Sequence, residues 1–304
     1  MPHELLADRP VDEAKSKATV EAGGLPIRAQ RRIYELQTSK NPIFTSTLSP
    51  SETVVARATG VEAMSQVMGS SVYHVGFGNF GQWQGGELGP LTQAYEQARS
   101  RALSRMQQEA MMLRAHAVVD VKFIGRGFEW GADLVEFNAV GTAVRIQGLP
   151  VPQYPALTLL KADELYKLHN AGYWPVAIAI GNCFWYEPHC DCPCDGSFYS
   201  RELPGHTQVS QNARDVSVQR FRAFAHHFKA DGVVGVTVER RGKNREYETG
   251  TEHNKKHHTA FNMELVVLGT AVVRRADAGP EAKPARPDLV VDLRDLEARN
   301  AKHG

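Results

Sequence analysis

An internal repeat constrains the fold of this chain more than any other feature of its sequence. A shift of 115 residues aligns 87–121 with 202–236, and a shift of 128 residues superimposes identical Gly-Thr-Ala-Val runs at 141–144 and 269–272. Ahead of these segments, a shift of 112 residues aligns the starts of the two repeats. The shift changes only between matched segments and always grows, as loop insertions in a duplicated unit would produce. We therefore predict two tandem copies of one unit.

Both copies show the same order of predicted elements. In the first copy, Ser49 can cap a short helix, Glu52 can complete the capping box, and the helix ends by Gly60. Apolar spacings of three or four residues predict a long helix, and alternating residues predict strands. The first copy thus has a strand at 63–75, a helix at 91–115 and strands at 119–123 and 132–146. The second copy has strands at 175–186, 234–238 and 259–274 and a helix at about 213–228.

The predicted fold class is α+β, with two tandem β-α-β-β domains, each a three-stranded sheet with one long helix. So small a sheet has two open edges and one uncovered face, and is only marginally stable alone. That face carries apolar residues in both copies (Leu134, Val140, Val266 and Leu268), so we expect neighbouring units to cover it and the chain to form a homo-oligomer. The expected divisions are a partly disordered extension at 1–42, a first domain at 43–147, a second at 156–275 and a linker with a C-terminal tail at 276–304.

Composition excludes several classes of protein. The 304 residues include 35 Lys and Arg and 34 Asp and Glu, so the net charge of +1 gives no general attraction to nucleic acid or to a membrane surface. No stretch is long and apolar enough to span a membrane, and the N-terminal residues lack the apolar core of a secretion signal. Four cysteines are too few for a disulfide scaffold. We expect a cytoplasmic protein with reduced thiols and neither a nucleic-acid nor a membrane partner.

A short run in the second copy is rich in metal-ligand residue types. It contains His189, Cys190, Cys192 and Cys194, and Cys183 lies upstream as a further candidate. Thiolate and imidazole groups bind zinc and other thiophilic divalent metals. The spacing differs from the Cys-x-x-Cys pairs of zinc fingers, so a thiol redox or oligomer-linking role and an inert loop remain alternatives. Eight of the twelve histidines also lie in the second copy.

Other motifs allow two interpretations each. The Gly/aromatic loop at 76–86 begins with a Gly-x-Gly-x-x-Gly string, but no helix opens at its third glycine, as a phosphate-binding loop requires. Its aromatic residues could instead stack on an aromatic ligand or pack on a neighbouring unit. Arg99 and Arg214, like Glu136 and Glu264, recur at equivalent places in the two copies, which fits either a cross-unit ion pair or solvated faces. We find no recognisable catalytic constellation.

The first copy resembles the YbjQ-like family, often labelled heavy-metal-binding, through 95–121, Val135-Glu136-Phe137 and the Gly-Thr-Ala-Val run at 141–144. The second copy resembles it through 225–236 and 269–272. The resemblance implies a dodecin-subunit-like fold that assembles into a ring, usually a pentamer. It implies no enzyme activity and no settled set of metal ligands. This chain departs from the family pattern by fusing two units and by adding loop insertions to the second.

The sequence therefore predicts a non-enzymatic, ring-forming protein that binds a metal through the Cys/His run. A purely structural scaffold is one alternative. A protein that binds a small aromatic, flavin-like ligand is the other.

Overall fold

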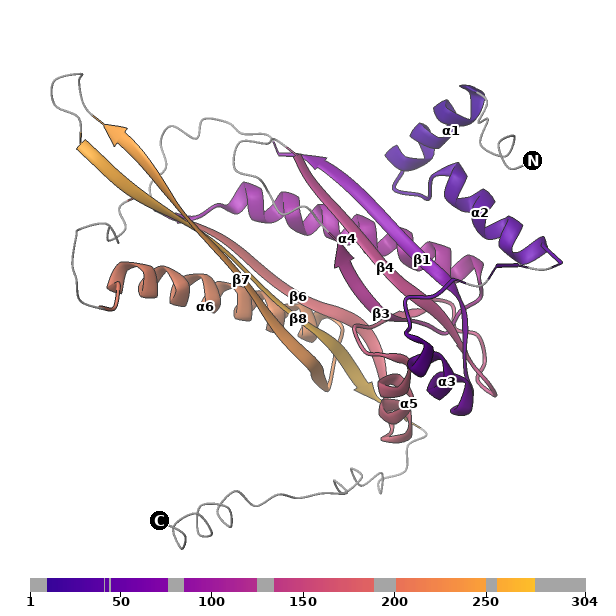
Figure 1. Ribbon diagram of the computed structural model, residues 1–304. Coiled ribbons are helices and arrows are strands. Elements are labelled where there is room, and N and C mark those ends of the chain that lie inside the picture. The colour runs from indigo at the N-terminus through magenta and orange to yellow at the C-terminus, as the bar shows by residue number, and fades with distance from the viewer. Residues whose placement is uncertain are drawn as a thin grey trace, which may run out of the picture.

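The computed structural model describes residues 10–40, 42–43, 45–75, 85–124, 134–188, 201–249 and 256–276. These residues form two β-sheets, each with one long helix against one of its faces (Figure 1). Within the described residues, none of the helices has both the length and the apolar character needed to cross a bilayer.

Sheet A contains the strands of the first repeat and has the order β1-β4-β3-β5. Its strands β1 (Val61–His74), β4 (Leu134–Ile146) and β3 (Ala117–Ile124) are antiparallel. The short strand β5 (Ala156–Leu157) runs parallel to β3. The helix α4 (Gly89–Met112) packs against β1 and β4, so the predicted long helix and strands are confirmed.

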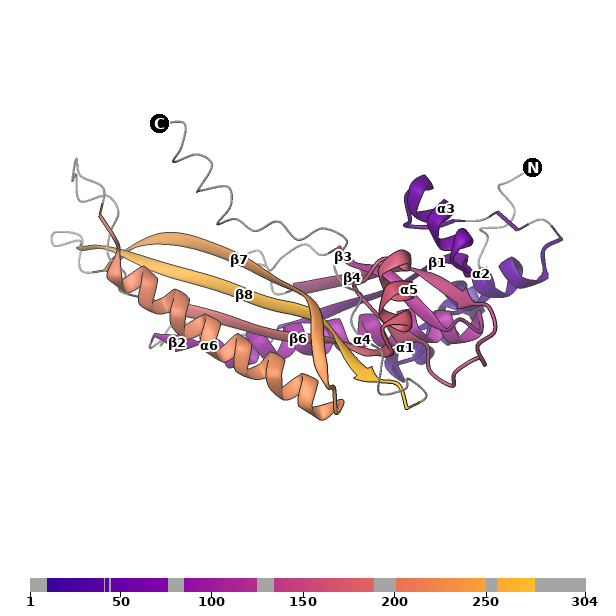
Figure 2. The same cartoon turned by 90° about the horizontal axis from the view of Figure 1, so that it is seen from below.

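Sheet B has the order β2-β6-β8-β7. Its strands are β2 (Gly86–Glu87), β6 (Tyr173–Glu187), β8 (Lys256–Arg274) and β7 (Gly232–Thr249), all antiparallel. The helix α6 (Pro204–His227) packs against β6 and β8. Figure 2 shows α6 along one side of sheet B, with α4 running beside the sheet on the other.

The expectation of three-stranded sheets was incomplete, because each sheet has a fourth, two-residue strand. The strand β2 follows the first repeat's own β1 in sequence but joins sheet B, and β5 precedes the second repeat but joins sheet A. Each repeat therefore covers one edge of the other's sheet. The edges that remain are β1 in sheet A and β7 in sheet B.

Short helices precede both sheets. The helix α3 (Pro50–Ala58) begins with the predicted capping box, in which Ser49 and Glu52 each accept a backbone N–H of the other. The helix α5 (Ala162–Asn170) has the same place before β6. The N-terminal extension contains two helices that the sequence analysis did not assign, α1 (Pro10–Glu21) and α2 (Ile27–Thr38), and Ile33 of α2 is fully buried.

Two glycines lie where the long helices cross the sheets. A Cβ atom at Gly69 would lie 1.9 Å from the carbonyl oxygen of Ala102 on α4, and one at Gly181 would lie 2.0 Å from that of Ser217 on α6. Interatomic distances this short exclude any side chain. The two glycines are 112 residues apart and the two helix residues 115 apart, so the sequence shifts reproduce the same helix–sheet contact.

Further details of the backbone recur at the same shifts. Thr142 Oγ1 accepts the N–H of Thr47 at 2.8 Å, and Thr270 Oγ1 accepts the N–H of Leu159 at 3.1 Å. In β3, Asp120 has a φ of 53°, and Gly235 has a φ of 62° at the equivalent place in β7. Both positions lie within an irregularity of the strand pairing.

Candidate functional site

The two sheets share one hydrophobic core across α4. Tyr95 on this helix contacts Phe137 of sheet A and Phe184 of sheet B edge-on, with ring centroids 5.6 and 5.2 Å away. Five residues of sheet B are buried in the same cluster as α4: Ile178, Ile180, Phe184, Val266 and Leu268. The prediction that a neighbouring unit covers the second sheet face is thus confirmed for sheet B.

A buried arginine links the repeats inside this core. Arg99 on α4 is 6% exposed and donates from Nη2 to Asn182 Oδ1 on β6 at 3.1 Å. Its Nη1 and the Nδ2 of Asn182 have no hydrogen-bond partner among the described residues. Burial lowers the pKa of Arg99 to about 10. Arg99 therefore makes a cross-unit contact, but with a neutral amide, and Arg214, its equivalent on α6, is exposed.

Acidic groups differ between the repeats in the same way. Burial raises the pKa of Glu264 on β8, and burial also raises the pKa of the neighbouring Tyr95 to about 12. Glu136, the equivalent glutamate on β4, is exposed. The contact between the two repeats, which we call the junction, thus buries the arginine of the first repeat and half-buries the glutamate of the second, whereas their counterparts are exposed.

Backbone hydrogen bonds extend the junction to one edge of each sheet. At the β3 edge, Asp120 donates its N–H to Leu160 O at 2.8 Å, and Thr158 donates its N–H to Val118 O at 3.0 Å. At the β6 edge, Leu88 donates its N–H to Phe184 O at 2.8 Å. Each repeat therefore lends a short extended segment to the other.

Ion pairs lie beside both edges. Arg220 on α6 pairs with Glu87 of β2 at 2.5 Å, and Lys161 pairs with Glu52 of α3 at 2.5 Å. The hydrogen bond from Lys161 holds the pKa of Glu52 at about 2. Sequence reasoning missed both pairs, because in each pair the two partners come from different repeats and lie far apart in the sequence.

A largely apolar cavity of about 560 Å³ lies between α4, β6 and α6. Its apolar walls include Leu103 of α4, Ile178 of β6 and Phe224 of α6. The equivalent place on the first repeat is covered by α1 and α2. There Arg105 donates to Gly24 O and Arg32 pairs with Glu109 at 2.6 Å.

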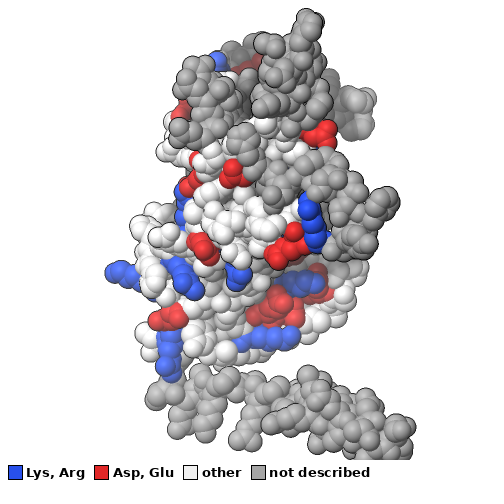
Figure 3. Space-filling view, turned by 90° about the vertical axis from the view of Figure 1, so that its left-hand side faces the viewer, with Lys and Arg blue, Asp and Glu red and all other residues white. Residues whose placement is uncertain are grey.

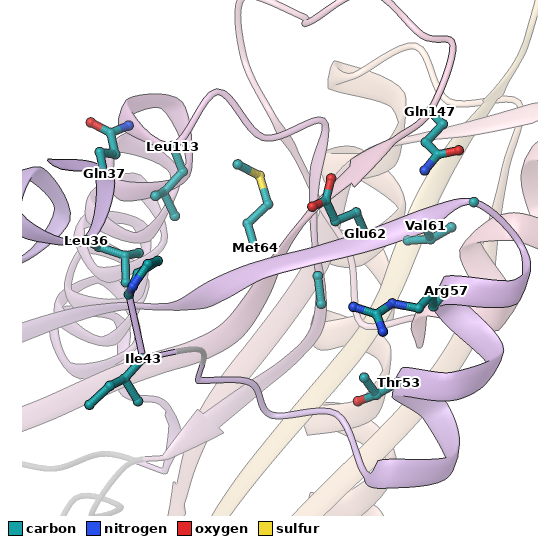
Figure 4. Close-up of a pocket in the computed structure, with 13 residues that line it drawn as sticks. Leu36, Gln37, Ile43, Thr53, Arg57, Val61, Glu62, Met64, Leu113 and Gln147 are labelled. Atoms are coloured by element: carbon teal, nitrogen blue, oxygen red, sulfur yellow. The ribbon is translucent and has the colours of Figure 1, made fainter. Parts of the chain in front are cut away.

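A second cavity, of about 680 Å³, lies between α2, α3 and β1. Figure 4 shows Leu36, Ile43 and Leu113 gathered at one end of it, while Thr53 and Arg57 line the other end from α3. Among the described residues that line the two cavities, no Ser or Thr hydroxyl is hydrogen-bonded to a carboxylate or an imidazole.

Sequence comparison defines the family. Residues 43–147 match the YbjQ family model, described as "Putative heavy-metal-binding". An encapsulin nanocompartment protein of Mycobacterium tuberculosis is 37% identical over 205 residues, which cover 64% of this chain and 76% of that protein. A UPF0145 protein of Archaeoglobus fulgidus is 37% identical over 113 residues, or 36% of this chain and 98% of that protein. The chain belongs to the YbjQ-like family. No solved structure matches it at a significant level.

The residues that match the YbjQ-like family model include no cysteine, and their histidines are His74 and His116. His116 is buried, its Nδ1 accepts the N–H of Ile146 at 3.1 Å, and its Nε2 lies 3.0 Å from Leu149 O. Both ring nitrogens thus bond to the backbone, and His116 has a structural role. The YbjQ-like region offers no cysteine for a thiolate metal site.

The predicted metal ligands of this YbjQ-like chain fall mostly outside the described residues. His189, Cys190, Cys192 and Cys194 lie in 189–200, and the described chain ends at Pro188 and resumes at Arg201. Cys183 is described: it is fully buried in the core between sheet B and α6, and burial raises its pKa to about 12. Among the described residues, no three His, Cys, Asp or Glu side chains are placed to hold a metal.

The remaining predictions concern the Gly/aromatic loop at 76–86 and the distribution of surface charge. Residues 76–84 of the Gly/aromatic loop lie outside the described ranges, and Gly86, which follows them, pairs with Tyr186 of β6. On the face shown in Figure 3, Lys and Arg lie among Asp and Glu, and the described residues there form no continuous patch of one charge.

Proposed function

We propose that this YbjQ-like protein is a non-enzymatic, self-assembling scaffold that works in the cytoplasm. The exposed outer face of sheet A carries this proposal. Met68 and Val72 on β1 are 45% and 61% exposed, whereas the equivalent Ile180 and Phe184 on β6 are 6% and 2% exposed. Val140 on β4 is buried, so the exposed part of this face lies along β1. An apolar strand face that is buried in one repeat and exposed in the other is typical of a surface that a partner covers. The name of the Mycobacterium tuberculosis relative supports extending to this chain a role in a protein nanocompartment.

The second repeat is, in our proposal, a second YbjQ-like domain at 156–275, after a first at 43–147. The recurrent helix–sheet contacts at Gly69 and Gly181 support this assignment, as do the recurrent threonine hydrogen bonds at Thr142 and Thr270. Duplication would supply two assembling units in one chain, with N- and C-terminal extensions outside them.

Metal binding is the second function that we propose, favoured by the His189, Cys190, Cys192 and Cys194 run and by the family description. These residue types suit zinc or another thiophilic divalent metal. We assign Cys183 no part in the site, because its side chain is fully buried in the core between sheet B and α6. The run belongs to the second repeat, so any metal site would be particular to that copy.

Native mass spectrometry of the untagged, reduced protein tests both proposals, with the triple variant Cys190→Ser, Cys192→Ser, Cys194→Ser alongside. We expect an oligomer that carries a stoichiometric metal mass, which the triple variant loses. The single variant Cys183→Ser is the matched control and should retain the metal. An oligomer without metal in any sample would contradict the metal proposal and support a purely structural scaffold. A monomer would contradict self-assembly.

The same spectra test the alternative of a small aromatic ligand. A co-purifying organic mass in these spectra, together with visible absorbance of the purified protein as flavin-like rings give, would favour a ligand store over a scaffold. The apolar cavity between α4, β6 and α6 would be the first place to examine.

A further inference from the structure

The contact between the two repeats is formed by one set of surfaces on each repeat. Each set has an equivalent on the other repeat that takes no part in this contact. The first repeat contributes to the junction through the β3 edge, α4 and the segment that contains β2. The second contributes the segment before α5 and the outer face and edge of β6. Each contributing part has an equivalent in the other repeat, so the chain carries a second, complementary pair of surfaces.

The first unused surface lies on the second repeat, at the β7 edge. In the junction, β3 is covered by 158–160, and its Val121 is 4% exposed. The equivalent Val236 on β7 is 51% exposed, and Val238 is 61% exposed. The backbone has the same local conformation in both strands: Asp120 of β3 and Gly235 of β7 both lie in the left-handed region, which interrupts each strand. An open sheet edge with exposed valines is a template for another strand.

The matching surface lies on the first repeat, in the segment 46–48 that precedes α3. The hydroxyl of Thr142 is hydrogen-bonded to the Ser46 hydroxyl and to the N–H of Thr47. The hydroxyl of Thr270 makes the same two hydrogen bonds to 158–160, with the Thr158 hydroxyl and the N–H of Leu159. Thr158 is fully buried beneath β3, whereas Ser46 is only half-buried and the preceding Thr45 is exposed. The segment therefore has the conformation of an added strand before any partner strand is present.

A second pair of unused surfaces strengthens the match. The edge of β6 is covered by β2, with Leu88 bonded to Phe184 and Glu87 paired with Arg220. No described strand pairs with the equivalent edge of β1, where Gln66 and Met68 donate their N–H groups to Thr45 O and Glu109 Oε2 of the same chain. The residues equivalent to β2 and Leu88, at 201–203, directly precede α6, with Leu203 extended and Arg201 and Glu202 exposed. The sheet faces agree, since Val72 on β1 is exposed where Phe184 on β6 is buried.

We propose that copies of this chain associate head to tail by repeating their internal junction. The β7 edge, α6 and 201–203 of one copy contact 46–48 and the edge and outer face of β1 in the next copy. Ser46 would then donate its N–H to Val233 O, as Thr158 donates to Val118 O. Arg214 and Glu136, exposed in a single chain, would both be covered at this contact. Such a heterologous contact generates a closed ring or an open filament.

This inference rests on the proposed self-assembly, but it predicts which surfaces meet. One variant, Val236→Lys, disrupts the β7 side of the contact, and another, Val72→Lys, disrupts the β1 side. We expect each variant alone to be a monomer of the 33.6 kDa chain mass in light scattering. An equimolar mixture should give dimers and nothing larger, because each pair of chains retains one intact contact and has no way to extend it.

Tyr154→Lys is the matched control, since Tyr154 is 60% exposed but lies in the segment between the two repeats, outside the surfaces of the proposed contact. This variant should keep the wild-type oligomer, and circular dichroism should show wild-type folding for all three variants. Oligomers of wild-type size in both edge variants would overturn the head-to-tail contact and leave self-assembly intact. Two monomeric variants that form no dimer on mixing would also overturn it. A monomeric wild type would overturn the proposed function as well.

Discussion

Arg99 on α4 donates a hydrogen bond of 3.1 Å to Asn182 on β6, and this bond joins the two repeats inside their common core. A buried guanidinium is costly to desolvate, and this cost lowers the pKa of Arg99 to about 10. Arg214 occupies the equivalent place on α6 and is exposed. The same residue type in the same local structure thus has two environments, according to whether a second unit lies against it.

Removing the partner of Arg99 should destabilise the protein. Asn182→Ala would leave the buried charge with one acceptor fewer, at a cost of about 1–3 kcal/mol. The free energy of unfolding in urea, at one fixed protein concentration, measures this change. Asn170→Ala, at the exposed end of α5, is the control and should change stability by less than about 0.5 kcal/mol. Equal effects from the two variants would show that the Arg99–Asn182 bond adds no stability.

The glycines under the long helices should tolerate no methyl group. Gly69→Ala and Gly181→Ala would each push a Cβ within about 2 Å of a helix carbonyl, so we expect each to cost about 1–3 kcal/mol or more. Gly89→Ala in the first turn of α4 is the control, because no atom of the described residues lies within 4 Å of its added Cβ. That change should be neutral or stabilise by up to about 1 kcal/mol. Thermal unfolding compares the three, and a stable Gly181→Ala variant would contradict the close helix–sheet contact.

The sequence predicted the repeated elements well and the contacts between them poorly. Periodicity gave α4 and β8 almost to their ends, because each buries a long apolar face. The strands β2 and β5 have two residues each, too few for any periodicity, and each exists through pairing with the other repeat. The helix α2 carries a short apolar pattern around Ile33 that could have predicted it. Nothing in the sequence distinguishes Arg99 from Arg214, since only their position relative to a neighbouring unit differs.

The ion pair between Glu52 and Lys161 should make a pH-dependent contribution to stability. The pKa of Glu52 is about 2 in the folded state, below the ordinary value of 4.5, so folding favours the charged carboxylate. The stabilisation is therefore fully present above pH 4.5 and is lost as the pH falls toward 2. A double-mutant cycle of Glu52→Gln and Lys161→Met should give a coupling of about 0.2–1 kcal/mol at pH 7, the range for solvent-accessible pairs. A coupling that stayed constant from pH 7 to pH 3 would show that the charge of Glu52 has no part in it.

The thiol of Cys183 should be inert in the folded protein. It is fully buried and its pKa is raised to about 12, so neither access nor thiolate is available to an alkylating reagent. Iodoacetamide should label Cys183 in urea but not in buffer, as peptide mass spectrometry would reveal. The cysteines at 190, 192 and 194 provide the internal comparison, since added zinc should slow their labelling if they bind it. Rapid labelling of Cys183 in buffer would contradict the packing of α6 on sheet B.

The number of units in the assembly should be even. Each chain contributes two repeats, and the internal junction uses one surface of each, so a head-to-tail assembly adds repeats in pairs. The five-membered ring that the family resemblance implies is therefore not open to whole chains with both repeats in the ring. Native mass spectrometry counts chains directly, and a closed ring would give one discrete mass whereas a filament would give a series. Five chains would mean ten repeats in one ring, because a ring of first repeats alone would need the β3 edge and the face of α4 that the second repeat of the same chain already covers. Val236→Lys should abolish any such ring, because every contact between chains uses β7, and a ring that persists in this variant would contradict the even count.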